Sequence, residues 1–163
     1  MEYLDIVDEN DNVIKNAPRN EVYEKKLIHR IVHVLVFDKS GRMAIQLRTP
    51  NKSFCPDTWS TAVGGHVKAG ETYEEGALRE YQEELGVTSD IELAFKDFYN
   101  DGRGLRKFVA TFKTTFEGPF HPNPDDIQRF DFFTMDEIGE LIKKGDKFHP
   151  ELLFLLKKYY NVG

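Results

Sequence analysis

The sequence predicts a single α/β domain. Its 163 residues suffice for one domain with a sizeable hydrophobic core. Segments with the apolar patterns of strands alternate with segments that have helical periodicity. No repeat or low-complexity linker interrupts this alternation, so we expect residues 1–163 to form one domain.

Strands are predicted through the first part of the chain. Residues 3–16 favour a β-hairpin, because apolar residues flank an Asp- and Asn-rich turn at 8–12. The apolar run 30–38 predicts a buried strand, which a Lys-Ser-Gly turn separates from a second strand at 42–48. A polar loop, 49–57, leads to a short strand, 59–63, that ends at Gly64-Gly65.

Helices and strands alternate in the rest of the chain. Residues 71–85 have helical periodicity and are followed by Gly86, a residue type that commonly ends helices. We expect strands at 90–99, 105–116 and 129–133, and helices at about 135–143 and 149–160. The leucines of the last segment, like Trp59, are interpreted as core residues.

Composition excludes several functional classes. The formal net charge of −6 offers no general attraction to nucleic-acid phosphates. No run of 18 apolar residues is present, so we expect no membrane span, and the first ten residues lack the pattern of a secretory signal. A single cysteine, Cys55, excludes an internal disulfide and fits a reducing compartment. These observations predict a cytoplasmic protein.

The predicted helix 71–85 carries charges that disfavour a helix. Glu83 and Glu84 lie in its last turn, where the helix dipole favours basic residues. Glu80 projects on the same side as these two, and like charges at such spacing cost roughly 0.2–0.5 kcal/mol per pair. Arg79 compensates only part of this repulsion, and Gly76 adds a further mid-helix penalty.

A bound divalent cation would relieve this repulsion. Clustered carboxylates suit magnesium or manganese, which bind through few protein ligands together with substrate phosphates. On this interpretation, the missing side chain of Gly76 leaves space for a ligand beside the acids. The alternative is an ordinary solvated acidic helix face, and the helix alone leaves both interpretations open.

The wider segment resembles the Nudix box. From Gly65 it reads GHVKAGETYEEGALREYQEELGV, with Glu71, Arg79-Glu80, Glu83-Glu84 and Gly86 at the spacing of the motif; only Tyr81 departs, where an aliphatic residue is usual. This resemblance implies a Nudix α/β/α sandwich, with a mixed β-sheet between helices. Residues 65–87 would form the box, and residues 1–18 an N-terminal hairpin extension.

The resemblance also implies an activity and a set of roles. Nudix hydrolases cleave a diphosphate linked to another moiety, usually in a nucleoside diphosphate derivative, with Mg²⁺ or Mn²⁺. Carried over by position, Glu80, Glu83 and Glu84 bind the metal, with a backbone carbonyl of Gly64 or Gly65. Arg79 orients the acids and Glu71 braces the loop. The implied partner is a small-molecule diphosphate substrate.

The general base is less well defined by the resemblance. In some relatives it lies within the box, here Glu80 or Glu83, and in others on a loop roughly 40 residues downstream. Asp126 stands at such a downstream position and is our candidate. The alternative interpretation is an aspartate that caps or shapes a proline-rich turn.

The flanking segments resemble a branch related to type I isopentenyl diphosphate isomerases, which makes isomerisation the alternative activity. His29 and His66 match metal positions of these isomerases. The isomerase cysteine position, however, holds Gly64, and its two downstream glutamate positions hold Leu105 and Lys107. Because the box acids are retained, we favour hydrolysis. A non-catalytic Nudix sensor is the third option.

Other residues carry weaker signals. Arg48, at the end of a strand, is a candidate phosphate ligand, and His66 a candidate contact to substrate or metal; surface or loop roles are the alternatives. His33, inside an apolar strand, is interpreted as structural. The N-terminal hairpin either pairs across a homodimer or caps its own sheet, and the sequence leaves both open.

Overall fold

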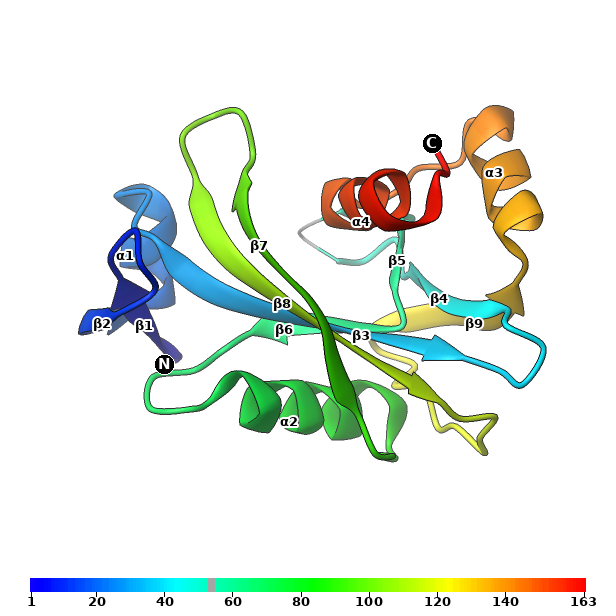
Figure 1. Cartoon of the computed structure of the whole chain (residues 1–163), viewed down its shortest axis with the longest axis horizontal. Helices are drawn as coiled ribbons and strands as arrows, with labels where there is room; N and C mark the ends of the chain where they lie inside the picture. Colours follow the sequence, from blue (N-terminus) through cyan, green and yellow to red (C-terminus); the bar gives the residue numbers. More distant parts are fainter. Residues whose placement is uncertain (53–54) are drawn as a thin grey trace.

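A seven-stranded mixed sheet forms the centre of the structure, with helices on both faces (Figure 1). The computed structural model describes residues 1–52 and 55–163, so part of the expected loop 49–57 lies outside the described residues. The sheet consists of β3 (His29–Phe37), β4 (Met43–Arg48), β5 (Trp59–Thr61), β6 (Val63–His66), β7 (Glu92–Asn100), β8 (Arg106–Thr115) and β9 (Ile127–Phe133).

Strand β3 is the central strand. It runs parallel to β8 along its whole length, from His29 opposite Lys107 to Phe37 opposite Thr115. Strand β7 extends the sheet antiparallel to β8, and β9 pairs antiparallel with β4 on the other side. Strand β9, which the sequence predicted at 129–133, begins two residues earlier, at Ile127.

Each face of the sheet has its own core. Helix α2 (Tyr73–Leu85) lies below the sheet in Figure 1, and α3 (Met135–Lys144) and α4 (Pro150–Tyr160) lie above it. Because side chains alternate along a strand, even-numbered valines of β3 such as Val34 pack with α2, whereas Leu35 packs with α4. The α4 leucines Leu152, Leu155 and Leu156 are buried, and so is Trp59, as predicted.

The segment predicted as one short strand, 59–63, consists of two. Strand β5 pairs with β4, whereas β6 pairs with β3, and the change of partner occurs at Ala62. Strands β3 and β4 are themselves paired only at Phe37 and Met43. The sheet is therefore split between β4 and β6, and the box helix α2 follows directly after the split.

The N-terminal hairpin is present as expected, formed by β1 (Tyr3–Val7) and β2 (Val13–Pro18). A short helix, α1 (Arg19–Glu24), follows it and was missed by the sequence reasoning. Six residues contain too little periodicity to identify a helix, although Pro18 directly before it is compatible with a helix start. Leu4, Ile6, Ala17 and Val22 form a separate small core here.

Candidate active site

The acidic helix is α2, and its ends are set by local sequence. At its N-terminus, the Thr72 hydroxyl accepts from the backbone N–H of Glu75, and the Glu75 carboxylate accepts from the N–H of Thr72, a complete capping box. At its C-terminus, Gly86 adopts φ 69°, a left-handed conformation that favours glycine. Helix α2 therefore begins and ends where the predicted helix does, to within two residues.

Arg79 is the centre of the charged side of α2. Its guanidinium donates to both carboxylate oxygens of Glu71, at 2.7 and 3.0 Å, and to Glu80 Oε1 at 2.8 Å. It also donates to the backbone carbonyl of His66 at 2.9 Å and to Glu83 Oε2 at 3.3 Å. One planar fork thus joins three acids and the strand before the helix, an arrangement that an ammonium group does not reproduce.

Glu71 ties the loop before α2 together. Besides its bidentate pairing with Arg79, its Oε1 accepts from the backbone N–H of Lys68 at 2.7 Å. Gly76 lies against this loop, because a Cβ there would lie 3.3 Å from Glu71 Oε1 and 3.4 Å from Val67 Cγ2. The expectation that Gly76 leaves space for a ligand is therefore wrong; the glycine accommodates the loop.

Glu80 occupies space that Gly65 provides. A Cβ at position 65 would lie 2.3 Å from the Glu80 carboxyl carbon and within 2.7 Å of both of its oxygens. Side chains do not tolerate such contacts, so the acid can take this position only opposite glycine. The box glycine and the box acid are thus complementary across the interface of β6 and α2.

Glu84 reaches into the split between β4 and β6. Its Oε1 accepts from Gln46 Nε2 at 2.8 Å, and its Oε2 from the backbone N–H of Gly64 at 3.3 Å. Gln46 also donates to the carbonyl of Ala62, where the chain passes from β5 to β6. Sequence reasoning missed Gln46; the available signal was a polar residue inside the apolar strand AIQL.

Glu80 and Glu84 are neighbouring carboxyls, and the charge of one affects the pKa of the other. Burial raises the pKa of Glu84 well above its ordinary value of 4.5, and the adjacent Glu80 charge raises it further. Burial also raises the pKa of Glu80, although Arg79 opposes this. Two neighbouring carboxylates repel each other, and a proton on one of them relieves that repulsion. A hard divalent cation could take the place of that proton, so this oxygen donor set fits magnesium or manganese.

Glu83 points more to solvent than its two neighbours. Its side chain is 54% exposed, against 17% for Glu80, and it makes the longest of the Arg79 contacts. In the described residues no group of three His, Cys, Asp or Glu side chains is arranged to hold a metal. The assignment of Glu80, Glu83, Glu84 and the Gly64 carbonyl as metal ligands therefore stays a prediction.

The side chain of Asp126 contacts residues other than the box acids. Its Oδ1 accepts from Lys52 Nζ at 2.6 Å, and its Oδ2 from Asn123 Nδ2 at 3.3 Å. Backbone N–H groups of His121 and Asn123 donate to the carbonyls of Leu85 and Glu84, which attaches this loop to the end of α2. The contacts match the turn interpretation, and the role of Asp126 as general base stays a prediction.

The two candidate substrate ligands, Arg48 and His66, both interact with other residues of the chain. His66 Nε2 is 2.5 Å from the Tyr23 hydroxyl, and its ring packs edge-on against the Tyr23 ring. Burial lowers the pKa of His66 to about 3. Arg48 lies near Cys55 and His149: burial raises the pKa of the Cys55 thiol while the Arg48 charge opposes this, and burial lowers the pKa of His149 to about 4, with a small further contribution from Arg48. Substrate contacts for Arg48 and His66 therefore stay predictions.

At a position where the isomerases carry a metal-binding glutamate, this chain has a residue of opposite charge, Lys107. Lys107 stands opposite His29 on the neighbouring strand, and its ammonium group pairs with Glu151 at 2.6 Å. Burial lowers the pKa of His29 to about 4. A cation therefore stands where the isomerases place a metal-binding glutamate.

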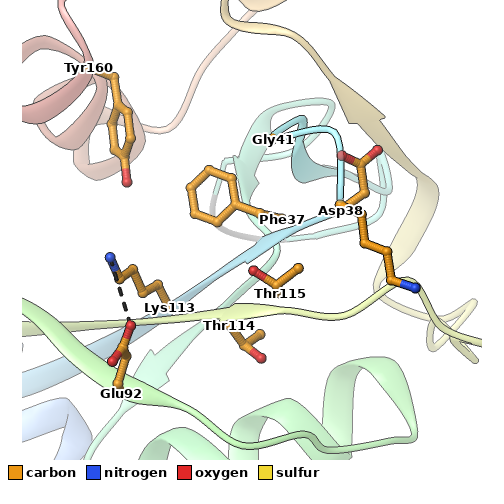
Figure 2. Close-up of a pocket in the computed structure, with 9 residues that line it drawn as sticks. Phe37, Asp38, Gly41, Glu92, Lys113, Thr114, Thr115 and Tyr160 are labelled. Atoms are coloured by element: carbon orange, nitrogen blue, oxygen red, sulfur yellow. Dashed lines mark ion pairs between the residues drawn. The ribbon is translucent and has the colours of Figure 1, made fainter.

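Two surface recesses lie elsewhere on the molecule. One, of about 480 Å³, is lined by Phe37 and Thr115 at the ends of β3 and β8 and by Tyr160 at the end of α4, and Figure 2 shows the Glu92–Lys113 ion pair at its side. The other, of about 470 Å³, lies between Glu74 and Leu78 of α2 and the segment 88–91 that follows the helix. Neither recess contains Glu80, Glu83 or Glu84. Within the described ranges, no helix is both long and apolar enough to cross a membrane.

Comparisons with known proteins place the geometry in a family. A family model described as NUDIX domain matches residues 27–156. An uncharacterized Nudix hydrolase of Yersinia pestis is 34% identical over 153 residues, covering 94% of this chain and 82% of the relative. One from Streptomyces coelicolor is 38% identical over 139 residues, covering 84% and 77%.

Solved structures agree with this placement. The crystal structure of DR0079 from Deinococcus radiodurans superposes with a TM-score of 0.85 at 28% identity, covering 98% of this chain and 99% of that one. A MutT NUDIX hydrolase from Burkholderia pseudomallei superposes with a TM-score of 0.64 at 18% identity, covering 81% and 98%, a likeness of fold alone. The α/β/α fold expected from the sequence is confirmed.

Proposed function

The chain belongs to the Nudix family and is a Nudix pyrophosphohydrolase, and we propose that it hydrolyses a nucleoside diphosphate joined to another moiety, with Mg²⁺ or Mn²⁺ bound at the box acids. The single observation that carries the metal dependence is that Glu84 accepts from the backbone N–H of Gly64 while Glu80 packs against the adjacent Gly65, which brings the two carboxyls to one place. Two acids in one partly buried position are stabilised by a proton or by a cation, and a cation can in addition stabilise charge on the oxygens of a diphosphate.

Each box residue has a share in the proposed reaction. Glu80, Glu83, Glu84 and the Gly64 carbonyl would hold the metal. A divalent cation at these groups would offset the charge on the diphosphate oxygens and lower the pKa of a water. Arg79 keeps Glu80 and Glu83 in place while Glu71 secures Arg79. Gln46 holds one oxygen of Glu84 and leaves the carboxylate in a fixed orientation.

The bonds exchanged are those of an anhydride hydrolysis. The water oxygen forms a bond to one phosphorus atom while the bridging P–O bond breaks, which gives two phosphate-terminated products. The water proton passes to a general base, and we assign that base to a box carboxylate, Glu80 or Glu83. The contacts of Asp126 support this assignment, because its two carboxylate oxygens already accept hydrogen bonds from Lys52 and Asn123. Asp126 remains the second candidate.

A substrate panel tests the proposal. Purified protein is incubated with nucleoside diphosphate sugars, dinucleoside polyphosphates and free nucleotides, with Mg²⁺, with Mn²⁺ and with chelator, and products are resolved by chromatography. We expect metal-dependent cleavage between two phosphorus atoms of at least one compound, abolished by Glu84→Gln. Tight binding of a compound without turnover would support the sensor instead, and cleavage that persists in chelator would contradict the metal dependence.

A further inference from the structure

A buried hydrogen-bonded network lies on the face of the sheet opposite the box helix. His33 of β3 is 5% exposed and lies between Thr61 Oγ1, at 2.7 Å from Nδ1, and Glu151 Oε1, at 2.9 Å from Nε2. The other carboxylate oxygen of Glu151 pairs with Lys107 Nζ at 2.6 Å. A buried carboxylate that binds two partners from different strands holds the His33 ring in one orientation.

Glu151 is itself held in place by the start of α4. The backbone N–H of His149 donates to the carbonyl of Trp59, and the N–H of Trp59 donates to the carbonyl of Lys147. These bonds attach the beginning of α4 to β5, directly before β6. The first turn of a helix also favours a carboxylate, through the helix dipole. The position of Glu151 relative to β6 is therefore fixed by backbone contacts.

The His33 ring lies directly against Gly64. A Cβ at position 64 would lie 2.9 Å from His33 Nδ1, 3.2 Å from Cε1 and 3.3 Å from Thr61 Oγ1. Only glycine allows the ring to approach the backbone this closely. On the other side of β6, the N–H of the same Gly64 donates to Glu84, and Gly65 packs against the Glu80 carboxyl. Strand β6 thus separates the buried network from the box acids by one backbone layer.

We propose that His33 and Glu151 are positioning residues that press Gly64 into the place where its backbone serves the box acids. The inference rests on the proposed function, since it concerns the same site. The C-terminal helix thereby takes part in the reaction without touching substrate. His33, which sequence reasoning interpreted as structural, sets the position of the Gly64 N–H and carbonyl.

A double-mutant cycle between His33 and Gly64 tests the contact. Gly64→Ala alone places a methyl group against the ring and should lower Mn²⁺ affinity and kcat by tenfold or more. His33→Ala alone removes the backing and should lower both by about tenfold, with KM for substrate little changed. In the double variant the methyl group fills part of the vacated space, so the combined loss should be at least tenfold smaller than the product of the single losses.

Variants of Glu151 provide the matched comparison. Glu151→Gln keeps an acceptor for His33 and should retain Mn²⁺ affinity within threefold, whereas Glu151→Ala should reproduce the His33→Ala loss. Asp97→Asn is the control, because Asp97 binds Lys158 and Tyr159 of α4 without contacting the network. It should lower the melting temperature and leave Mn²⁺ affinity and kcat unchanged.

Amide exchange of Gly64, measured by NMR, gives a readout independent of turnover. Exchange should accelerate at least tenfold in Glu151→Ala and stay as in the wild type in Asp97→Asn. Unchanged exchange, or losses that simply multiply in the double variant, would overturn the positioning role. If His33→Ala does not fold, the Glu151 pair and the exchange data carry the test. A wild type that cleaves no diphosphate refutes the proposed function, whereas amide exchange still decides the inference.

Discussion

The carboxyl group of Glu80 fills the space that a side chain at Gly65 would need, since a Cβ there would lie 2.3 Å from its carboxyl carbon. The glycine that opens the box therefore acts on the acid fifteen positions later in the sequence. Strand β6 and helix α2 must both be in place before this contact exists. The relationship makes position 65 a determinant of the site rather than of the loop alone.

Gly65→Ala should therefore strongly reduce turnover while leaving the fold intact. The methyl group displaces Glu80 from its position beside Glu84, and we expect kcat/KM to fall by about 100-fold or more, a loss of roughly 3 kcal/mol of transition-state stabilisation. Steady-state kinetics on the substrate found in the panel measures the loss, with circular dichroism to confirm folding. Activity within threefold of the wild type would show that Glu80 is not needed at this position.

Glu84→Gln should reduce turnover by orders of magnitude and should raise the melting temperature of the metal-free protein. Burial and the neighbouring Glu80 raise the folded-state pKa of Glu84 above its ordinary value of 4.5. Folding therefore favours the protonated carboxyl, and the stability that it contributes is lost as the pH rises above 4.5 toward the folded pKa. The melting temperature of the variant relative to the wild type, without metal, should rise over this range. A variant that melts below the wild type at neutral pH would contradict the repulsion.

Arg79→Lys should lower kcat by about 10- to 100-fold although the charge is kept. The guanidinium makes five hydrogen bonds, to three acids and one carbonyl, that a single ammonium group cannot reproduce. Part of the Mn²⁺ affinity should be lost with kcat, because Glu80 and Glu83 lose a common partner. If Arg79→Lys and the wild type had equal kcat, Arg79 would act only through its positive charge.

Asp126→Asn should retain activity within about threefold, because the proposed base lies in the box and Asp126 already binds Lys52. The pH dependence of kcat is the measurement. Its acidic limb should keep its position in Asp126→Asn and disappear in the Glu80 or Glu83 variant that removes the base. A drop of 100-fold with loss of the acidic limb in Asp126→Asn would instead identify Asp126 as the base.

Asp11→Asn should destabilise the protein by about 2 kcal/mol without changing kcat. Asp11, in the hairpin turn, accepts from Arg30, Tyr73 and Lys96 at 2.6–2.7 Å. Burial opposes ionisation, yet these partners lower the pKa of Asp11 below its ordinary value of 3.8. Its stabilisation is therefore present above pH 3.8 and lost as the pH falls toward the folded pKa. Urea unfolding at pH 7 and pH 3 measures both effects. If Asp11→Asn and the wild type were equally stable at pH 7, the contacts of Asp11 would not stabilise the fold.

Features carried by local sequence were predictable. The box helix, its glycine end and the hairpin each depend on residues close together in the chain, so their pattern indicates them directly. The repulsion between acids on one helix face left a cation site and a solvated face both open, whereas the resemblance of the wider segment to the Nudix box indicated the family, which the family model confirms. Contacts across layers were not predictable in this way: Gln46 with Glu84, and His33 with Gly64, join residues that only the split sheet brings together.

Two errors have the same physical origin. Gly76 was expected to open space for a ligand, because the helix was considered without the loop that packs on it. The segment 59–63 was expected to be one strand, because its apolar pattern does not reveal a change of partner at Ala62. In both cases the neighbour that decides the structure lies outside the segment, and tertiary packing overrides the local pattern.

The most direct test of the metal site is anomalous diffraction from crystals soaked in Mn²⁺, with and without a non-hydrolysable diphosphate analogue. The account predicts a manganese peak between the carboxylates of Glu80 and Glu84 and the carbonyl of Gly64, and its loss in Glu84→Gln. An occupied analogue with no peak beside these residues would contradict it.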